Sequence, residues 1–224
     1  MPDKIKKTQR AIRQKSILTM RGIFRTRLNL ILMSSPLTGI FGGSFNPIHT
    51  GHIALARHLL TEAHLDEVWF LVSPLNPFKQ AAPDLLPDHL RYELACRALA
   101  DEPQLVASDY EFRLPRPSYT WQTLQHLRAD YPDRRFALII GADNWLAFDR
   151  WAHPDDILRH HPVIVYPREG YAVDPASLPP GVTLVDTPLY PVSSTLIRQR
   201  LAQHLPISGL VPPQIEKALL DVEC

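Results

Sequence analysis

A chain of 224 residues is long enough to bury a full hydrophobic core, and one domain is the expected number. Its 45% hydrophobic and 21% charged residues are typical of a soluble globular protein, and no apolar run is long enough to span a bilayer. The two cysteines, Cys96 and Cys224, indicate neither a disulfide framework nor a metal-binding pair. We therefore expect a cytoplasmic protein in which Cys96 is buried in a helix.

The formal charge of +1 is unevenly distributed along the chain. Residues 1–33 contain nine Lys or Arg residues and one acidic residue, whereas residues 34–224 contain 15 basic and 22 acidic residues. We interpret the first segment as a basic extension, either disordered or created by a start codon assigned too far upstream, with Met33 as the favoured start. A basic arm that contacts RNA or a membrane and a targeting peptide are the alternatives. Residues 34–224 are then the functional domain.

Residues 39–53, GIFGGSFNPIHTGHI, are the most informative stretch. They predict a buried strand over residues 37–41, a tight turn at Gly42 and Gly43, and a helix that begins near Thr50. Glycines let a phosphate approach the backbone, and the first turn of a helix presents unpaired amides to it. The stretch therefore predicts an anion-binding site.

His49 and His52 lie in the first turn of this predicted helix and flank Gly51. Imidazoles three residues apart can face one ligand, and we expect the glycine to keep the space between them open. This arrangement suits a polyphosphate. The alternative is that both histidines only cap the helix or pack in the core.

The pattern H-x-G-H at residues 49–52 resembles the HxGH nucleotidyltransferases, and GGSFNP at residues 42–47 is similar to the bacterial nicotinate-nucleotide adenylyltransferases. The resemblance extends over roughly residues 37–220. It implies transfer of an adenylyl group from ATP to nicotinate mononucleotide, which yields deamido-NAD and pyrophosphate in NAD biosynthesis. Strands that alternate with helices along the chain also predict a single doubly wound α/β domain with a Rossmann-like parallel sheet.

A second loop is predicted to reach the same edge of the sheet. Residues 67–72, EVWFLV, predict a buried parallel strand, and SPLNPFK follows at its carboxyl end. Asn76 and Lys79 offer an amide and a cation to a phosphate or a ribose, although a solvated turn is the alternative. Both match the pattern of the resembled family. The family usually has histidine where Phe78 stands, so a role of that histidine is not carried over.

Two further elements are predicted before the next motif. Residues 87–100 have helical spacing, and residues 105–112 read as a strand. Asp109 and Glu111 alternate with apolar residues along that strand, and we interpret them as its polar face without a catalytic role.

The segment RPSYTWQTL, residues 116–124, predicts a helix that Ser118 or Thr120 can cap. In the resembled family this segment lies beside the nicotinate ring. The resemblance implies that backbone amides at Tyr119 and Thr120 receive the carboxylate of the substrate. Gln122 stands where the family often has aspartate, so a contact that depends on that charge is not carried over.

Residues 136–140, FALII, predict a central strand that ends at Gly141. Asp143 follows, where it can accept hydrogen bonds from ribose hydroxyls or orient a hydrated metal ion; capping the next helix is the alternative. The resemblance implies that Trp151 stacks on the pyridine ring. The remaining tryptophans in this region, Trp121 and Trp145, are expected to pack in the core.

The last part of the chain predicts strands over residues 162–166 and 182–186 and a closing helix over residues 212–222. Between them, VSSTLIRQRL at residues 192–201 predicts a helix capped by Ser193 or Ser194, with Arg198 near its N-terminus. This is a second anion-binding helix N-terminus. It matches the ISxTxIR pattern of the resembled family with valine for isoleucine.

The expected chemistry is an in-line attack of a substrate phosphate on the α-phosphorus of ATP. The sequence has no P-loop or GxGxxG motif, so phosphate binding falls to the two helix N-termini. We assign His52 to the α-phosphate and His49 to the β/γ side, with Mg²⁺ carried by ATP because no dedicated ligand cluster is visible. The other ATP-binding candidates are Gly42, Gly43, Ser44 and Phe45 in the nucleotide pocket and Ser194, Thr195 and Arg198 on the pyrophosphate.

Two groups of alternatives remain. The same mechanism could act on nicotinamide mononucleotide or phosphopantetheine or in a cytidylyl transfer, although the SYT segment and Trp151 favour a pyridine nucleotide. The chain could also be a non-catalytic nucleotide sensor or RNA-binding module that uses its basic extension. The acidic charge of residues 34–224 argues against RNA, so we expect neither a nucleic acid nor a membrane partner.

Overall fold

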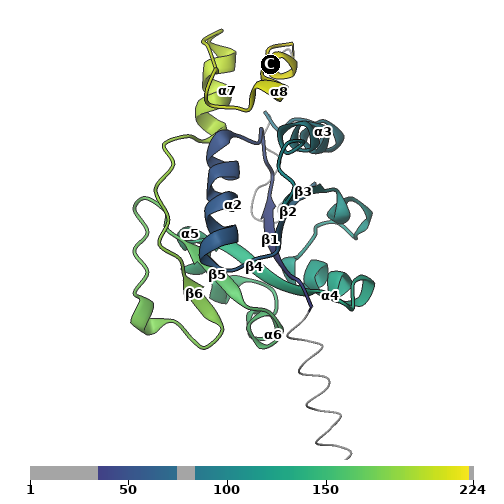
Figure 1. The fold of residues 1–224 in the computed structure, drawn as a ribbon, viewed down its shortest axis with the longest axis vertical. Helices are drawn as coiled ribbons and strands as arrows, with labels where there is room; N and C mark the ends of the chain where they lie inside the picture. Colours follow the sequence, from purple (N-terminus) through teal and green to yellow (C-terminus); the bar gives the residue numbers. More distant parts are fainter. Residues whose placement is uncertain (1–34, 75–83, 222–224) are drawn as a thin grey trace, which may run out of the picture. The chain divides into compact units, whose positions relative to one another are not determined.

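The computed structural model describes residues 35–74 and 84–221. Residues 37–224 form one compact unit. Within the described residues, six parallel strands form one sheet in the order β3-β2-β1-β4-β5-β6 (Figure 1). The predicted doubly wound parallel sheet is therefore confirmed. The strands are β1 Leu37–Gly43, β2 Glu67–Val72, β3 Leu105–Ser108, β4 Arg135–Gly141, β5 Val163–Tyr166 and β6 Val182–Leu184.

Helices connect and cover these strands. The α-helices are α2 Thr50–Glu62, α3 Asp88–Ala98, α4 Thr120–Asp130, α5 Ala142–Trp145, α6 Pro154–His160, α7 Ser194–Ala202 and α8 Pro213–Leu220. The described part of the chain also contains three short 3₁₀ turns, η1 Tyr110–Arg113, η2 Phe148–Arg150 and η3 Pro175–Ser177.

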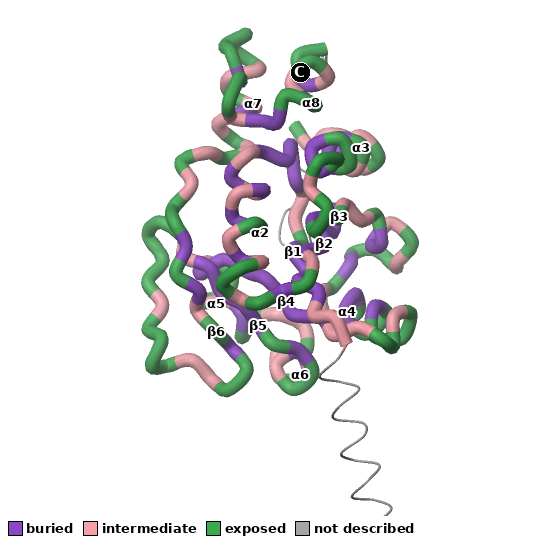
Figure 2. The backbone as a smooth tube through the Cα atoms, viewed as in Figure 1, coloured by how far each residue is buried: buried purple, intermediate pink, exposed green. Residues whose placement is uncertain are grey.

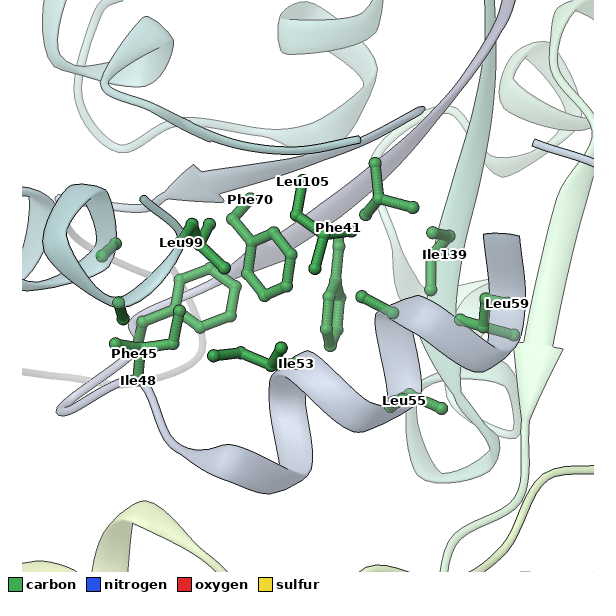
Figure 3. Close-up of a cluster of buried hydrophobic side chains, with 14 of the residues drawn as sticks. Phe41, Phe45, Ile48, Ile53, Leu55, Leu59, Phe70, Leu99, Leu105 and Ile139 are labelled. Carbon is green, nitrogen blue, oxygen red and sulfur yellow. The ribbon is translucent and has the colours of Figure 1, made fainter. Parts of the chain in front are cut away.

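The central strands bury side chains on both faces, which is why their sequences are nearly continuous apolar runs. Along β1, Phe41 packs into a core with α2, α3, α7 and α8, whereas its neighbour Ile40 packs into a second core with α4 and α6. Along β4, Ile139 and Leu138 alternate in the same way. Figure 2 shows these strands as buried tube, and Figure 3 shows the first core around Phe41 and Phe70.

The strand order places a topological switch point between β1 and β4. From β1 the chain continues outward through β2 to β3, and from β4 it continues in the opposite direction through β5 to β6. Open α/β sheets bind ligands outside the carboxyl ends of the strands at such a point. The loop that carries His49 and the segment that carries Asp143 follow these two strands.

The structure corrects the predicted turn at the end of the first strand. Gly42 and Gly43 remain in β1, where they pair with Leu71 and Val72 of β2. The chain turns two residues later, at Phe45, whose φ of 44° lies in the left-handed region. The two glycines therefore do not mark the turn, because both have partners in the β-sheet.

Two other expectations were wrong. The strand predicted over residues 105–112 ends at Ser108, because the Ser108 hydroxyl accepts a hydrogen bond from the Tyr110 amide and turns the chain into η1. Glu111 is consequently buried rather than part of a polar face. Cys96 is exposed, because the buried face of α3 is formed by Leu94, Ala95 and Ala98.

In the described ranges, every helix is too short or too polar to cross a membrane.

The packing of α2 on the sheet gives a test of the fold. Leu59 is fully buried in the first core, so Leu59→Ala should lower the free energy of unfolding by about 2–5 kcal/mol. Urea denaturation followed by circular dichroism measures this loss. Leu220→Ala, at a side chain that is 56% exposed, is the control and should change the value by less than about 0.5 kcal/mol. Equal effects of the two substitutions would contradict the packing described here.

Candidate active site

The loop after β1 is held in place by Phe45. Although its backbone is left-handed, the ring is only 3% exposed and packs in the first core against Phe41, with ring centroids 5.6 Å apart. The His52 ring also contacts these two rings, with its centroid 5.1 Å from that of Phe45 and 6.0 Å from that of Phe41. Burial of this aromatic ring offsets the cost of the unusual φ angle and fixes the start of α2 relative to β1.

His49 and His52 form a reciprocal capping pair. His49 is the N-cap of α2, and its Nδ1 accepts a hydrogen bond from the His52 amide at 3.3 Å, while Nδ1 of His52 accepts one from the His49 amide at 3.3 Å. The rings are stacked, with centroids 3.6 Å apart. An amide can only donate, so in each neutral imidazole the proton sits on Nε2. The pair therefore caps the helix and also carries two Nε2–H donors.

Both imidazoles are neutral near pH 7. Burial and, to a smaller extent, the positive charge of Arg168 together lower the pKa of His49 to about 4. Burial also lowers the pKa of His52 well below its ordinary value, with contributions from His49 and Arg168. Stacked rings this close could not both be charged without strong repulsion. A bound polyphosphate would raise both pKa values, because a nearby anion favours the imidazolium form.

Arg168 is a site residue that the sequence did not predict. It follows Tyr166, the last residue of β5, and its guanidinium lies 5.4 Å from the Tyr166 ring centroid. Its Nε lies 3.6 Å from Oδ1 of Asp143. The available signal was an arginine two residues after the carboxyl end of a buried strand, which places a cation at the ligand-binding edge of the sheet.

Asp143 does not cap α5. The N-cap is Gly141, without a side-chain cap, and the buried Oδ1 of Asp143 has no hydrogen-bond partner in the part of the chain that the structure describes. A Cβ on Gly141 would lie 2.4 Å from this oxygen and 3.0 Å from Arg168 side-chain atoms. Glycine at residue 141 is therefore required to let the carboxylate and the guanidinium approach β4.

The N-terminus of α7 lies against the loop before α2. Ser193 caps α7 by accepting a hydrogen bond from the Leu196 amide at 3.1 Å. The Ser194 hydroxyl donates to the Pro47 carbonyl at 2.9 Å, and Thr195 is exposed. The two predicted anion-binding helix N-termini are thus brought together by direct contact.

Arg198 joins the same loop to the segment that precedes α3. Its Nη1 donates to the Asn46 carbonyl at 2.8 Å, and its Nε donates to the Asp84 carboxylate at 2.6 Å, which lowers the pKa of Asp84. The Asn46 amide also binds this segment, because Nδ2 donates to the Asp84 carbonyl and Oδ1 accepts from the Leu86 amide. Arg198 is therefore paired with an acidic side chain and a backbone carbonyl.

The space beside Gly51 is filled, contrary to the sequence-based expectation. A Cβ at residue 51 would lie 2.6 Å from Cγ1 of Val192 and 3.2 Å from Cβ of Tyr190. Glycine is needed here so that the segment leading into α7 can pack on the first turn of α2. The glycine of the H-x-G-H motif thus allows the N-termini of α2 and α7 to pack together.

The residues predicted to contact the pyridine ring of the acceptor lie at the start of α4 and in the segment before α6. Tyr119 is the N-cap of α4 without a side-chain hydrogen bond, so the predicted caps Ser118 and Thr120 were wrong. The Ser118 hydroxyl is buried and has no partner among the described residues. Trp121, on the first turn of α4, has its ring centroid 5.7 Å from that of His153, and Trp151 lies two residues before that histidine.

Trp151 is partly buried, and its ring centroid lies 5.2 Å from that of Phe148. Trp121 and Trp145 pack against the second core as predicted. Asn76, Lys79 and Phe78 lie outside the described residues.

Comparison with known proteins assigns the family. The model of the cytidylyltransferase-like family matches residues 40–200. A Bacteroides fragilis protein named "Probable nicotinate-nucleotide adenylyltransferase" is 50% identical over 188 residues, which cover 84% of this chain and 93% of that protein. The chain belongs to the nicotinate-nucleotide adenylyltransferase family. The resemblance seen in the sequence is thereby confirmed.

Other members of the nicotinate-nucleotide adenylyltransferase family agree. A protein of the same name from Porphyromonas gingivalis is 44% identical over 168 residues, covering 75% of this chain and 85% of that protein. The structure of Plasmodium falciparum nicotinic acid mononucleotide adenylyltransferase complexed with NaAD superimposes with a TM-score of 0.68 at 19% identity, covering 83% of this chain and 97% of that chain. At this identity the structural match shows the shared fold.

The charge of Arg168 gives a prediction about the histidine pair. Arg168→Met removes a cation that disfavours imidazolium, so the pKa values of His49 and His52 should both rise, with the His49 midpoint moving up from about 4 toward 6.5. Long-range ¹H–¹⁵N NMR of the imidazoles, titrated from pH 8 downward, measures the midpoints and the tautomer. Arg97→Met, at an exposed arginine, is the control. Unchanged midpoints in Arg168→Met would contradict the conclusion that the charge of Arg168 lowers the pKa values of His49 and His52.

The contact at Gly51 gives a second prediction. Gly51→Ala should push α7 away from α2, lowering both the melting temperature and the rate of product formation, because the added Cβ overlaps Val192. Val192→Ala in the same chain removes the overlapping methyl groups and should restore part of both losses. Differential scanning calorimetry and the assay described below measure this rescue. No rescue would mean that another contact sets the requirement for glycine.

Proposed function

We propose that this protein transfers the adenylyl group of ATP to nicotinate mononucleotide and releases pyrophosphate, giving deamido-NAD. The observation that carries the proposal is the capping pair of His49 and His52. It places two Nε2–H donors at a helix N-terminus beside the switch point of the sheet. The names of the relatives, and the NaAD held by the Plasmodium enzyme, support the same reaction and product.

The reaction needs positioning rather than a protein nucleophile. An oxygen of the 5′-phosphate of nicotinate mononucleotide attacks the α-phosphorus of ATP, and the bond from that phosphorus to the bridging α–β oxygen breaks in line. Pyrophosphate leaves with the bonding electron pair. We assign His52 to the α-phosphate and His49 to the β/γ side. Neutral Nε2–H groups can donate to phosphate oxygens and can stabilise the charge that develops in the transition state.

Arg198 and α7 would hold the pyrophosphate leaving group. Arg198 already lies at the loop between β1 and α2 through its contact with the Asn46 carbonyl. Its other partner is the Asp84 carboxylate, and a phosphate of the bound nucleotide would replace this carboxylate. The exposed hydroxyl of Thr195 is free to join this contact, whereas Ser194 helps by holding α7 against Pro47.

A divalent cation such as Mg²⁺, bound to the ATP phosphates, would supply neutralisation of their charge. The part of the chain that the structure describes contains no group of three or more His, Cys, Asp or Glu side chains that could hold a metal ion. Asp143 offers one buried carboxylate oxygen that accepts no hydrogen bond among the described residues, which suits either a ribose hydroxyl or a water of the hydrated ion.

On the acceptor side, the first turn of α4 fits a carboxylate. Its amides are not capped by a side chain, and the Ser118 hydroxyl beside it is buried without a partner among the described residues. A nicotinate carboxylate would satisfy these donors, whereas the amide group of nicotinamide would bring N–H groups toward them. We propose that amides at Tyr119 and Thr120 receive this carboxylate and that Trp151 stacks on the ring.

A pyrophosphate-release assay tests the proposal directly. ATP and Mg²⁺ are supplied with nicotinate mononucleotide, nicotinamide mononucleotide or phosphopantetheine in parallel reactions. We expect strong release with the first acceptor and formation of deamido-NAD by chromatography. Release with another acceptor alone would replace the proposed substrate, and release with none would favour a non-catalytic nucleotide sensor.

The role of His52 has its own test. His52→Ala removes the donor assigned to the α-phosphate, so kcat should fall by about 10²–10³-fold, the usual loss for one donor to a developing charge. Steady-state kinetics with nicotinate mononucleotide measure the change. His160→Ala, at an exposed histidine of α6, is the control and should keep wild-type turnover. Near-normal turnover of His52→Ala would refute the assignment.

A further inference from the structure

Arg91 is a fully buried arginine on α3 that sequence analysis did not single out. Its side chain has 0% exposure. Each of its five N–H donors has an acceptor: the carbonyls of Ser44, Ser73, Pro74 and Leu86 and the carboxylate of Asp88. A buried guanidinium is tolerated only when its donors are paired in this way. The guanidinium therefore fixes several backbone segments relative to one another.

Three of these acceptors, the carbonyls of Ser44, Ser73 and Pro74, belong to the loops that leave β1 and β2. Ser44 follows β1 in the segment that we assign to ATP, and Ser73 follows β2. The Ser73 amide donates to the Gly43 carbonyl at 2.9 Å, so the ends of the two strands are joined both by the ladder and through Arg91. Nη1 of the Arg91 guanidinium donates to both Ser44 and Ser73, so this one group holds the loop after β1 beside the loop after β2.

Two chains of polar contacts connect Arg91 and its acceptor residues to α4. Asp88, which accepts from Arg91 at 2.7 Å, also pairs with Arg116 at 3.1 Å, three residues before the N-cap of α4. In parallel, the buried carboxylate of Glu111 is hydrogen-bonded by the Ser73 side chain and, at 2.9 Å, by the hydroxyl of Thr123 on the first turn of α4. Burial raises the pKa of Glu111, whereas the two hydroxyls lower it.

We propose that Arg91 is a positioning residue that sets the distance between the ATP-side loop and the acceptor-side turn of α4. It acts through Asp88 and Arg116, with Glu111 as a second link from Ser73. The proposal rests on the proposed function for the assignment of the two sides, but the physical connection does not. In-line transfer requires the attacking oxygen and the α-phosphorus to be held at a fixed separation, so a shift of either loop reduces the rate.

The experiment compares Arg91→Lys, Arg116→Met and Glu111→Gln with the wild-type chain. Lysine keeps the charge of Arg91 but loses the planar fork of donors. Arg116 is half-exposed, so Arg116→Met breaks the outer link without opening the core. Arg97→Met is the matched control, because Arg97 lies on the same helix and pairs only with exposed Glu93 among the described residues.

The first readout is hydrogen–deuterium exchange, which does not depend on catalysis. Arg116→Met and Glu111→Gln should speed exchange of the amides at residues 118–123 about tenfold, and Arg91→Lys should do so at residues 43–46 as well. Arg97→Met should change neither segment. Unchanged exchange at residues 118–123 in both Arg116→Met and Glu111→Gln would overturn the proposal, even if the melting temperature falls.

The second readout is the split of kinetic constants. Arg116→Met and Glu111→Gln should raise KM for nicotinate mononucleotide with little change in KM for ATP, whereas Arg91→Lys should raise both and lower kcat, by about tenfold in each case. The double variant Arg91→Lys/Arg116→Met should lose less than the product of the single losses, because both act through Asp88. Equal effects on both substrates from all three variants would indicate general destabilisation and refute the positioning role. An inactive wild-type chain would refute only the proposed function.

Discussion

The reciprocal hydrogen bonds between His49 and His52 are the constraint on which the rest of the site depends. Each backbone amide of the pair donates to the Nδ1 of the other residue. These bonds cap amides at the start of α2, and the His52 amide also donates to the His49 carbonyl at 3.0 Å. They also fix both tautomers, because an accepting Nδ1 leaves the proton on Nε2. Capping and phosphate binding are therefore compatible roles of the same two side chains, and the choice between them posed by the sequence does not arise.

The electrostatics of the site follow from this geometry. Two stacked imidazoles next to Arg168 are held neutral by burial and by that neighbouring charge. They can then act as hydrogen-bond donors without the mutual repulsion of two cations. In the proposed function, the positive charge that faces a polyphosphate would come instead from Arg168 and Arg198, each of which is paired with a carboxylate, that of Asp143 or Asp84. An incoming triphosphate would compete with these carboxylates for the two guanidinium groups.

Buried polar groups beside the site hold its loops rather than simply stabilise the fold. Replacing a buried ion pair with apolar side chains is often neutral or stabilising, so a fully paired guanidinium such as Arg91 is weak support for stability. It is better explained by the four backbone carbonyls that it holds from three segments. Gly51 and Gly141 have a comparable role, because each permits a close approach that a Cβ would block.

The sequence alone determined the class of fold, the family and the histidine pair. Apolar runs that alternate with helical periods predict a parallel sheet, and H-x-G-H and GGSFNP are local patterns that can be read without knowing what lies nearby. The strands and helices were correctly placed wherever the apolar run was long, as in β2 and β4. The predicted boundary was wrong where a local polar contact changed the direction of the chain. At the end of β3, the Ser108 hydroxyl accepts a hydrogen bond from the Tyr110 amide and the strand stops.

Only the tertiary structure decided which side chains meet across distant segments. Arg168 follows β5 and reaches Asp143, which follows β4, and Val192, 141 positions after Gly51, fills the space beside that glycine. Arg91 binds carbonyls 47 and 18 positions earlier in the chain. Residue type and spacing report local geometry, whereas the strand order and the packing of helices on the sheet bring remote segments together. The physical reason is that such contacts depend on the whole arrangement of the sheet, which no single stretch of sequence contains.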